Sequence, residues 1–311
     1  MKSLYLIPLI LILFTSKLAA SEKYLESLES LQELYNGIVF DLPEHDDSRV
    51  NYGLFNSDRN MKRKASKYVS IGWHSKITEE MLCLANYEEP ADDLQKWQRL
   101  AKAHFLNAYN FCMIKMIADY LKANPNQLET VKEKGLQALG EDAFDQRECK
   151  VGSKKLSLND IRRILLDSKL RFYDPRSIYG LSSGAASDPR FSKGVFTSKN
   201  VDALLAELEN EFWNSREASR LNIQNDVLYL NPIVVSSQDH LRTLTEEETF
   251  KSYILSVVEE AAIADFVGES DPASWQAFAT DLSLNYTEDV PNSNDGRAYD
   301  EMKGWDLFCS K

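Results

Sequence analysis

The sequence is short of several features that would define its class at once. Its 311 residues include only four cysteines, four histidines, 12 glycines and nine prolines. So little glycine and proline excludes collagen-like and low-complexity chains, and 43% hydrophobic residues exclude intrinsic disorder. Basic residues are also scarce, 36 Lys and Arg against 48 Asp and Glu. We therefore expect no binding to nucleic acid or to a bare anionic membrane.

Only one long apolar run is present, and it lies at the N-terminus. Residues 4–14 are mostly apolar, Lys2 precedes them, and Leu18-Ala19-Ala20 supplies small residues before Ser21. This order is typical of a secretory signal peptide over residues 1–20, and the run is shorter than the roughly 20 residues that span a bilayer. An uncleaved N-terminal anchor is the alternative. We expect a soluble, secreted or periplasmic protein with no integral membrane segment after cleavage.

Export would place the four cysteines in an oxidising compartment, where they can form two disulfides in three possible pairings. No two of them are close enough in the sequence for a C-x-x-C redox or zinc pair. One of them falls on an apolar helix face and can also be a small buried hydrophobe. We expect at least one disulfide among Cys83, Cys112, Cys149 and Cys309.

Apolar residues recur mostly at helical spacing. The longest stripe predicts a helix over residues 92–121, and Ser157 with Asp160 predicts a capping box at the start of another helix. Strand-like segments are fewer, at residues 177–181 and at 227–235, where Pro232 breaks the second one.

Because helices outweigh strands and βαβ alternation is missing, the sequence predicts an α+β fold. We expect a helix-rich single domain packed on a small, mainly antiparallel sheet. Residues 21–285 would form this domain, and residues 286–311 an acidic loop and C-terminal tail.

The segment Gly180-Leu181-Ser182-Ser183-Gly184 fits the G-x-S-x-G pattern of a nucleophile elbow. His240 is the only histidine after it and would have to be the base. An elbow also needs a helix next, but Asp188-Pro189 stops a helix almost at once. A structural turn is therefore the favoured interpretation, and an amide or ester hydrolase with Ser182 or Ser183 as nucleophile is the alternative.

The histidines lack the spacing of metal ligands; they stand at His45, His74, His104 and His240. His104 follows the buried stripe of the long helix, so we interpret it as a core histidine rather than a ligand. The sequence indicates no metal and no cofactor.

Two polar features are more informative. Asn107 and Asn110 lie three residues apart inside the long predicted helix, and buried amides need hydrogen-bond partners. They predict either a structural polar network or a site that orients a ligand. In Asp174-Pro175-Arg176, the Asp and Arg side chains can clamp a turn through charge-assisted hydrogen bonds.

These residues belong to a set of segments that resembles the domain-of-unknown-function 547 family. F-L-N-A-Y-N at 105–110 is similar to the family's F-W-I-N-x-Y-N, and D-P-R-S-I-Y-G-L at 174–181 to its D-P-R-I-H-F-A-L. Further similar segments lie, in the family's order, at 50–54, 156–161, 197–201 with 212–215, and 281–285. The resemblance covers roughly residues 28–285.

The resemblance also implies a degenerate active-site strand. The family strand usually carries a His and then a Cys, followed by S-C-P. Here Ile178 stands at the His position, Ser183 at the first Cys, and Ser187-Asp188-Pro189 at S-C-P. A thiol nucleophile with its base cannot form from these residues.

Our first functional hypothesis is therefore a non-catalytic binding or scaffold module. Its site would lie between the helix with Asn107 and Asn110 and the segment from Asp174 to Ser183. Arg176 would hold Asp174 or an anionic group, and Asn285 of the last matching segment would join the polar network. The ligand is an unspecified protein, peptide or small molecule.

Overall fold

The structure is a computed structural model that describes residues 28–37, 39–42, 47–50, 55, 59–60, 62–64, 66, 91–151, 154–170, 172–185, 188–192, 194–215, 218–225, 227–270 and 275–277. Several sequence predictions fall outside these residues: the signal peptide over 1–20, Cys83, Asn285, Cys309 and the acidic tail over 286–311.

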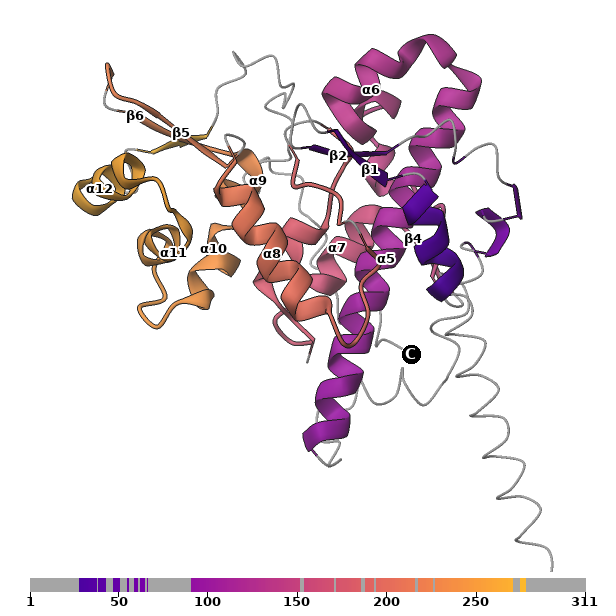
Figure 1. Cartoon of the computed structure of the whole chain (residues 1–311), viewed down its shortest axis with the longest axis horizontal. Coiled ribbons are helices and arrows are strands. Elements are labelled where there is room, and N and C mark those ends of the chain that lie inside the picture. The colour runs from indigo at the N-terminus through magenta and orange to yellow at the C-terminus, as the bar shows by residue number, and fades with distance from the viewer. Residues whose placement is uncertain are drawn as a thin grey trace, which may run out of the picture.

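A single long helix, α5 (Ala91–Ala123), runs through the middle of the fold (Figure 1). It covers the helix predicted over 92–121. Every residue from 101 to 114 is buried, so the middle of α5 is surrounded by other elements and not merely packed on one side. Polar side chains in that stretch must therefore find partners inside the protein.

The elements after α5 wrap around it. Helix α7 (Leu158–Leu165) and α8 (Val201–Trp213) lie beside it, and α11 (Phe250–Val257) and α12 (Ala261–Glu269) lie farther out on the side of α8 (Figure 1). The shorter helical pieces are η1 (Pro125–Gln127), α6 (Leu128–Lys134), η2 (Gly135–Leu139), η3 (Ala143–Asp145), η4 (Pro175–Gly180), α9 (Pro232–Ser236), α10 (Gln238–Leu241) and η5 (Arg242–Leu244). Residues 28–37 are also helical.

The strands form three small sheets. They are β1 (Val39–Leu42) with β2 (Asp47–Val50), β3 (Cys149–Val151) with β4 (Lys154–Leu156), and β5 (Ser219–Asn222) with β6 (Val227–Leu230) and β7 (Gln276–Ala277). All pairs are antiparallel except β6 with β7. The predicted helix-rich α+β class with mainly antiparallel pairing is confirmed, although the strands are divided among three sheets.

One local prediction is confirmed, one holds in part and one is wrong. The strand predicted over 227–235 holds for β6, whereas residues from Pro232 form α9, because Pro232 stands in the first turn and the Asn231 side chain caps it. Ser157 and Asp160 form the predicted capping box at the start of α7. Residues 177–181, predicted as a strand, instead belong to the 3-10 helix η4 and the residue after it. The cause is local, because Pro175 stands in the first turn and the Asp174 side chain accepts a hydrogen bond from the Arg176 N–H, which caps a helical turn.

A disulfide joins Cys112 of α5 to Cys149 of β3, with their Cα atoms 5.7 Å apart. The expectation of at least one disulfide is thus confirmed, and Cys112 is paired rather than a free buried thiol. The bridge fixes the β3–β4 hairpin to the middle of α5. Among the described helices, none combines the length and apolar character needed to cross a membrane.

Candidate functional site

Asn107 joins the centre of α5 to a main-chain segment far along the chain. Its Nδ2 donates to the Phe196 carbonyl at 2.7 Å, and its Oδ1 accepts from the Phe196 N–H at 2.9 Å. The side-chain amide therefore pairs with a peptide unit as another peptide would. Asn107 is fully buried, so both bonds are made away from water.

Asn110 makes a similar connection one turn later. Its Nδ2 donates to the Gly180 carbonyl at 2.8 Å, which fixes the end of η4 to α5. Its Oδ1 has no hydrogen-bond partner among the described residues. In this structure both asparagines bind main chain and act as clamps between helix and loop.

η4 places an aspartate and an arginine in one ion pair. The Asp174 Oδ1 accepts from both the N–H and the Nε of Arg176, each at 3.0 Å, and Oδ2 accepts from Nη2 at 2.9 Å. This two-pronged pairing fixes the plane of the guanidinium. Asp174 is buried, whereas 27% of the Arg176 side chain is exposed.

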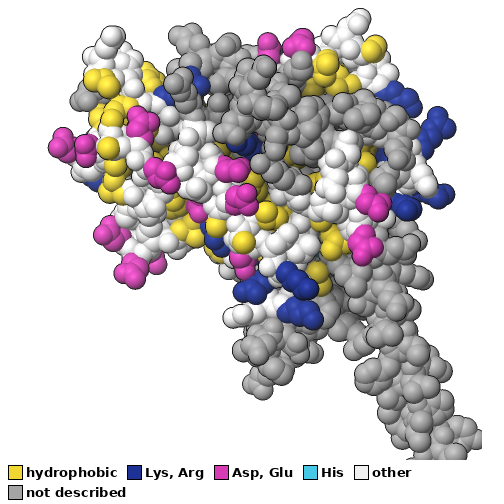
Figure 2. Space-filling model, in the orientation of Figure 1, with side chains coloured by type: hydrophobic (Ala, Val, Ile, Leu, Met, Phe, Trp, Pro, Cys, Tyr) yellow, Lys and Arg dark blue, Asp and Glu magenta, His cyan; other side chains and the backbone are white. Residues whose placement is uncertain are grey.

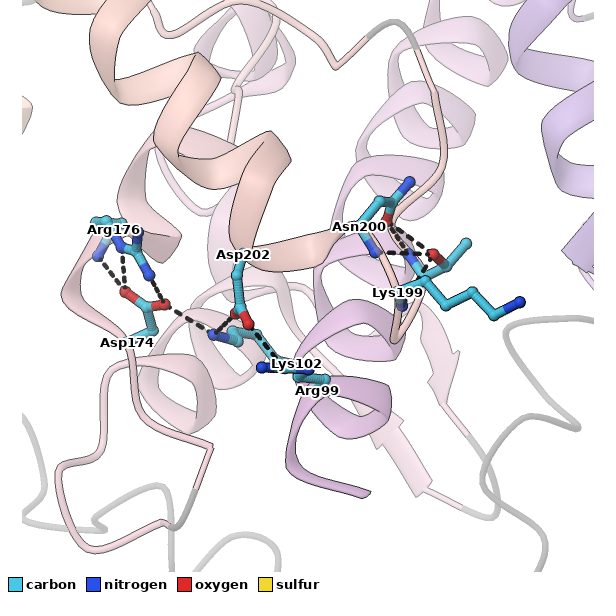
Figure 3. Close-up of polar contacts among 8 residues, drawn as sticks. Arg99, Lys102, Asp174, Arg176, Lys199, Asn200 and Asp202 are labelled. Carbon is cyan, nitrogen blue, oxygen red and sulfur yellow. Dashed lines mark hydrogen bonds and ion pairs between the residues drawn. The ribbon is translucent and has the colours of Figure 1, made fainter. Parts of the chain in front are cut away.

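Lys102 links this pair to helix α8. Its Nζ lies 2.7 Å from Asp174 Oδ2 and 2.8 Å from Asp202 Oδ1, although only 9% of the side chain is exposed. Arg99, one turn earlier on α5, pairs with the other oxygen of Asp202 at 2.8 Å. Figure 3 shows the resulting chain of alternating charges across α5, η4 and α8. We call Arg99, Lys102, Asp174, Arg176 and Asp202 the charge cluster.

Both carboxylates of the cluster stay charged at neutral pH. Burial alone would raise the pKa of Asp174, but hydrogen bonds and positive charge from Arg176 and Lys102 lower it below its usual range. The pKa of Asp202 is lowered in the same way by Lys102 and Arg99 against the effect of burial. The hydrogen bond to Asp174 raises the pKa of Arg176.

A second polar network lies against the same elements. The Tyr253 hydroxyl donates to Glu209 Oε1 at 2.7 Å, and it lies 2.6 Å from the Tyr179 hydroxyl. Trp213 Nε1 donates to both hydroxyls, at 2.9 Å to Tyr179 and 3.1 Å to Tyr253. Because Tyr253 has one proton and gives it to Glu209, the Tyr179 hydroxyl must donate to Tyr253. Burial raises the pKa of Glu209, although Tyr253 and Arg176 oppose that shift.

The two serines of the elbow pattern take part in loop structure. Ser182 Oγ accepts from the Gly184 N–H at 3.1 Å, and the Ser183 N–H donates to Asp188 Oδ2. The Ser183 carbonyl accepts from the Leu136 N–H at 2.8 Å. Gly135, with φ of 55°, allows this close approach, because a Cβ there would lie 2.5 Å from the Ser183 carbonyl oxygen.

The predicted nucleophile and base are not joined. His240 Nδ1 lies 3.0 Å from the Tyr173 hydroxyl, and within the described part of the chain neither Ser182 nor Ser183 hydrogen-bonds a histidine. The other described histidine, His104, is buried on α5, and burial lowers its pKa to about 4. A Ser–His pair needs hydrogen-bond reach, and neither described histidine is hydrogen-bonded to either serine.

Metal binding has no geometric support in the described segments, where no three His, Cys, Asp or Glu residues are placed to hold an ion. Of the residues singled out from the sequence, the structure brings together Asn107 and Asn110 with the segments they clamp, and Asp174 with Arg176. It leaves the serines and His240 in separate hydrogen-bond groups.

Sequence reasoning missed the residues that extend the site. Lys102 carried a signal, since it stands between buried alanines on the apolar part of α5. Asp202 and Glu209 carried none, because acidic residues on a helix ordinarily face solvent. Tyr179 belongs to the 174–181 segment but was interpreted as part of a strand.

A comparison with known protein families supports the family resemblance seen in the sequence. Residues 92–213, from the start of α5 to the end of α8, match the model of the family described as protein of unknown function, DUF547. This part of the chain is a domain of that family, and it includes the charge cluster and Glu209. No curated protein matches the chain, and no solved structure does.

Proposed function

We propose that this protein is an exported, non-catalytic binding module that holds an anionic group of its ligand on Arg176. One observation carries the proposal: a buried lysine supports a buried aspartate, and that aspartate holds an arginine at the surface in a fixed plane. Buried charges are costly unless they are fully paired, so such a cluster is a poor way to gain stability alone.

Arg176 retains donors for a ligand. Asp174 occupies Nε and Nη2, while Nη1 has no hydrogen-bond partner among the described residues. A guanidinium has five N–H donors in a rigid fork and suits carboxylate or phosphate. The charge cluster itself has three cations and two carboxylates, and this excess of positive charge favours an anionic group on Arg176.

The surface charge pattern is compatible with an anionic ligand. On the face shown in Figure 2, Lys and Arg side chains gather over the first half of α5 and again at the right-hand edge of the view, whereas Asp and Glu side chains gather over α11 and α12. A local positive field on an overall acidic protein attracts small anions. The absence of a joined Ser–His pair among the described residues supports binding over hydrolysis.

Calorimetric titration of the purified protein with inorganic phosphate and with an N-acetyl amino acid, which is a plain carboxylate, tests the proposal. We expect one of the two to bind, and Arg176→Gln to weaken that binding at least about ten-fold, equivalent to about 1.4 kcal/mol. Arg242→Gln, which removes a surface arginine paired with Asp239, is the matched control and should leave binding unchanged.

Equal affinity in Arg176→Gln and wild type, or no binding of either anion by wild type, would overturn this function. Circular dichroism of Arg176→Gln checks that the variant is folded. Export is tested separately by N-terminal sequencing of the secreted protein. We expect its first residue to be Ser21. Retention of residues 1–20 would contradict a cleaved signal peptide.

A further inference from the structure

We infer that the ligand of this site is a zwitterion, an α-amino acid, with its carboxylate on Arg176 and its ammonium group on Glu209. This rests on the proposed function, because it assigns the anionic group to the same arginine. It adds a second charged group, the Glu209 carboxylate on α8, and therefore defines the chemical class of the ligand. We call these two side chains the poles of the site.

The two poles lie along one boundary between η4 and α8. Arg176 and Tyr179 are three residues apart on a 3-10 helix, so their side chains lie on the same side of η4. Asp202 and Glu209 are seven residues apart on α8, so they share one face.

Hydrogen bonds connect both ends of this boundary. Asp174, which holds Arg176, and Asp202 share the ammonium of Lys102. At the other end, Tyr179 reaches Glu209 through the Tyr253 hydroxyl. Arg176 is thus placed beside the stretch of α8 between Asp202 and Glu209.

Arg176 and Glu209 influence each other without pairing. No ion pair within 4.0 Å joins these two described side chains. Burial raises the pKa of Glu209, yet the positive charge of Arg176 opposes that rise, and the charge of Glu209 helps to raise the pKa of Arg176. Opposite charges at such a boundary normally close onto each other when their side chains are free to do so. Here Asp174 holds the guanidinium and Tyr253 holds the carboxylate.

Each pole has an unused hydrogen-bonding atom. Glu209 Oε1 accepts from Tyr253, whereas Oε2 has no hydrogen-bond partner among the described residues. Arg176 Nη1 is likewise unused by the described chain. Glu209 is only partly buried, and Oε2 is not among the buried atoms that lack a partner, so this oxygen is open to a ligand ammonium group.

The opposite charges of Arg176 and Glu209 determine which class of ligand fits. A guanidinium binds a carboxylate, and a carboxylate binds an ammonium group. A ligand with two negative groups would place one of them against Glu209, and a ligand with two positive groups would place one against Arg176. A small molecule that has one group of each sign, close together, satisfies both poles, and an α-amino acid is such a molecule.

The inference is tested by measuring the thermal shift of the protein with each standard L-amino acid in turn, and then the affinity by calorimetry. We expect at least one free amino acid to bind wild type, and its N-acetyl derivative, which lacks the ammonium group, to bind roughly ten- to a hundred-fold more weakly. Glu209→Gln should bind the free and N-acetylated forms with equal, weak affinity. Arg176→Gln should lose both. Glu207→Gln, an exposed glutamate on the same helix, should behave as wild type.

The pH dependence of the affinity provides a second test. Because burial raises the pKa of Glu209, affinity for the free amino acid should fall on acidification at a higher pH than for an ordinary glutamate, and this fall should be absent in Glu209→Gln. A wild type that binds the N-acetylated form as tightly as the free form, or that binds only phosphate through Arg176, would overturn the zwitterion inference and leave the binding function standing. Binding of no anion at all would overturn both.

Discussion

Helix α5 carries two polar positions five residues apart that differ in what they leave exposed. Asn107 gives one donor and one acceptor to a single buried peptide unit, and both bonds are internal. Lys102 joins two carboxylates, and the cluster that it supports reaches the surface through Arg99, Arg176 and Asp202. The first arrangement is closed and the second is open, so the same helix supplies a structural clamp and a base for a binding site.

The largest effect should come from the closed position. Asn107→Leu keeps the approximate size of the side chain but leaves the buried N–H and C=O of Phe196 without partners, at a cost of about 4 kcal/mol in the free energy of unfolding. Urea unfolding followed by tryptophan fluorescence measures it. Asn214→Ala, an exposed amide, should change that free energy by less than about 0.5 kcal/mol. A loss below about 1 kcal/mol for Asn107→Leu would mean that the clamp is not structural.

A change at the open position, Lys102, should lower both the stability of the protein and its affinity for an anion. Lys102→Met leaves Asp174 buried with only Arg176, and we expect a loss of about 3 kcal/mol at neutral pH together with weaker anion binding. Asp174 has a lowered pKa, so its contribution to stability is present above the usual carboxyl range and is lost as the pH falls through the folded value. The gap between Lys102→Met and wild type should therefore narrow in acid.

A double variant provides the control for this prediction. Lys102→Met with Asp174→Asn should lose less than the sum of the two single variants, because no uncompensated carboxylate then remains. Additive losses would show that the lysine and the aspartate do not act together.

A smaller effect concerns the loss of stability in acid that the buried His104 on α5 causes. Burial keeps His104 neutral in the folded state with a pKa of about 4, whereas the unfolded chain takes up a proton below about pH 6.5. Stability is therefore lost as the pH falls from 6.5 toward 4, and at pH 5 the loss is about 2 kcal/mol. His104→Leu should remove this part of the pH dependence. Parallel unfolding free energies for the two proteins between pH 7 and pH 5 would contradict the buried, neutral assignment.

The smallest effect should come from the serine loop. Ser182→Ala removes one hydrogen bond to the Gly184 N–H, worth less than about 1 kcal/mol, and should leave ligand binding intact. A fluorophosphonate probe should label neither wild type nor the variant. Labelling of wild type that disappears in Ser182→Ala would restore the hydrolase hypothesis and end the non-catalytic one.

Periodic and local signals in the sequence predicted much of the fold. The three- and four-residue recurrence of apolar residues predicts α5, and the Ser157–Asp160 spacing predicts the cap of α7. The strand predicted over 177–181 is wrong because Asp174-Pro175-Arg176 starts a 3-10 helix directly before it. Asp174 caps the helix, Pro175 has a fixed φ, and the Arg176 side chain hydrogen-bonds Asp174.

The candidate site was predicted only in part. Asp174 with Arg176 is a contact over two residues, and a local motif can signal it. Lys102 with Asp202 and Glu209 with Tyr253 are contacts over 100 and 44 residues. Helical charge patterns cannot separate an acidic residue that meets a buried lysine from one that meets water, because both stand on the polar side of their helix.

The reach of Lys102 along the chain has a consequence for folding. Its partners lie 72 and 100 residues away, so its ion pairs form only after α5, η4 and α8 have docked. Contacts made that late are largely absent from the folding transition state. Lys102→Met should therefore speed unfolding while hardly changing the folding rate. The Lys102 ammonium group, which supports the binding site, would then also set the lifetime of the native state.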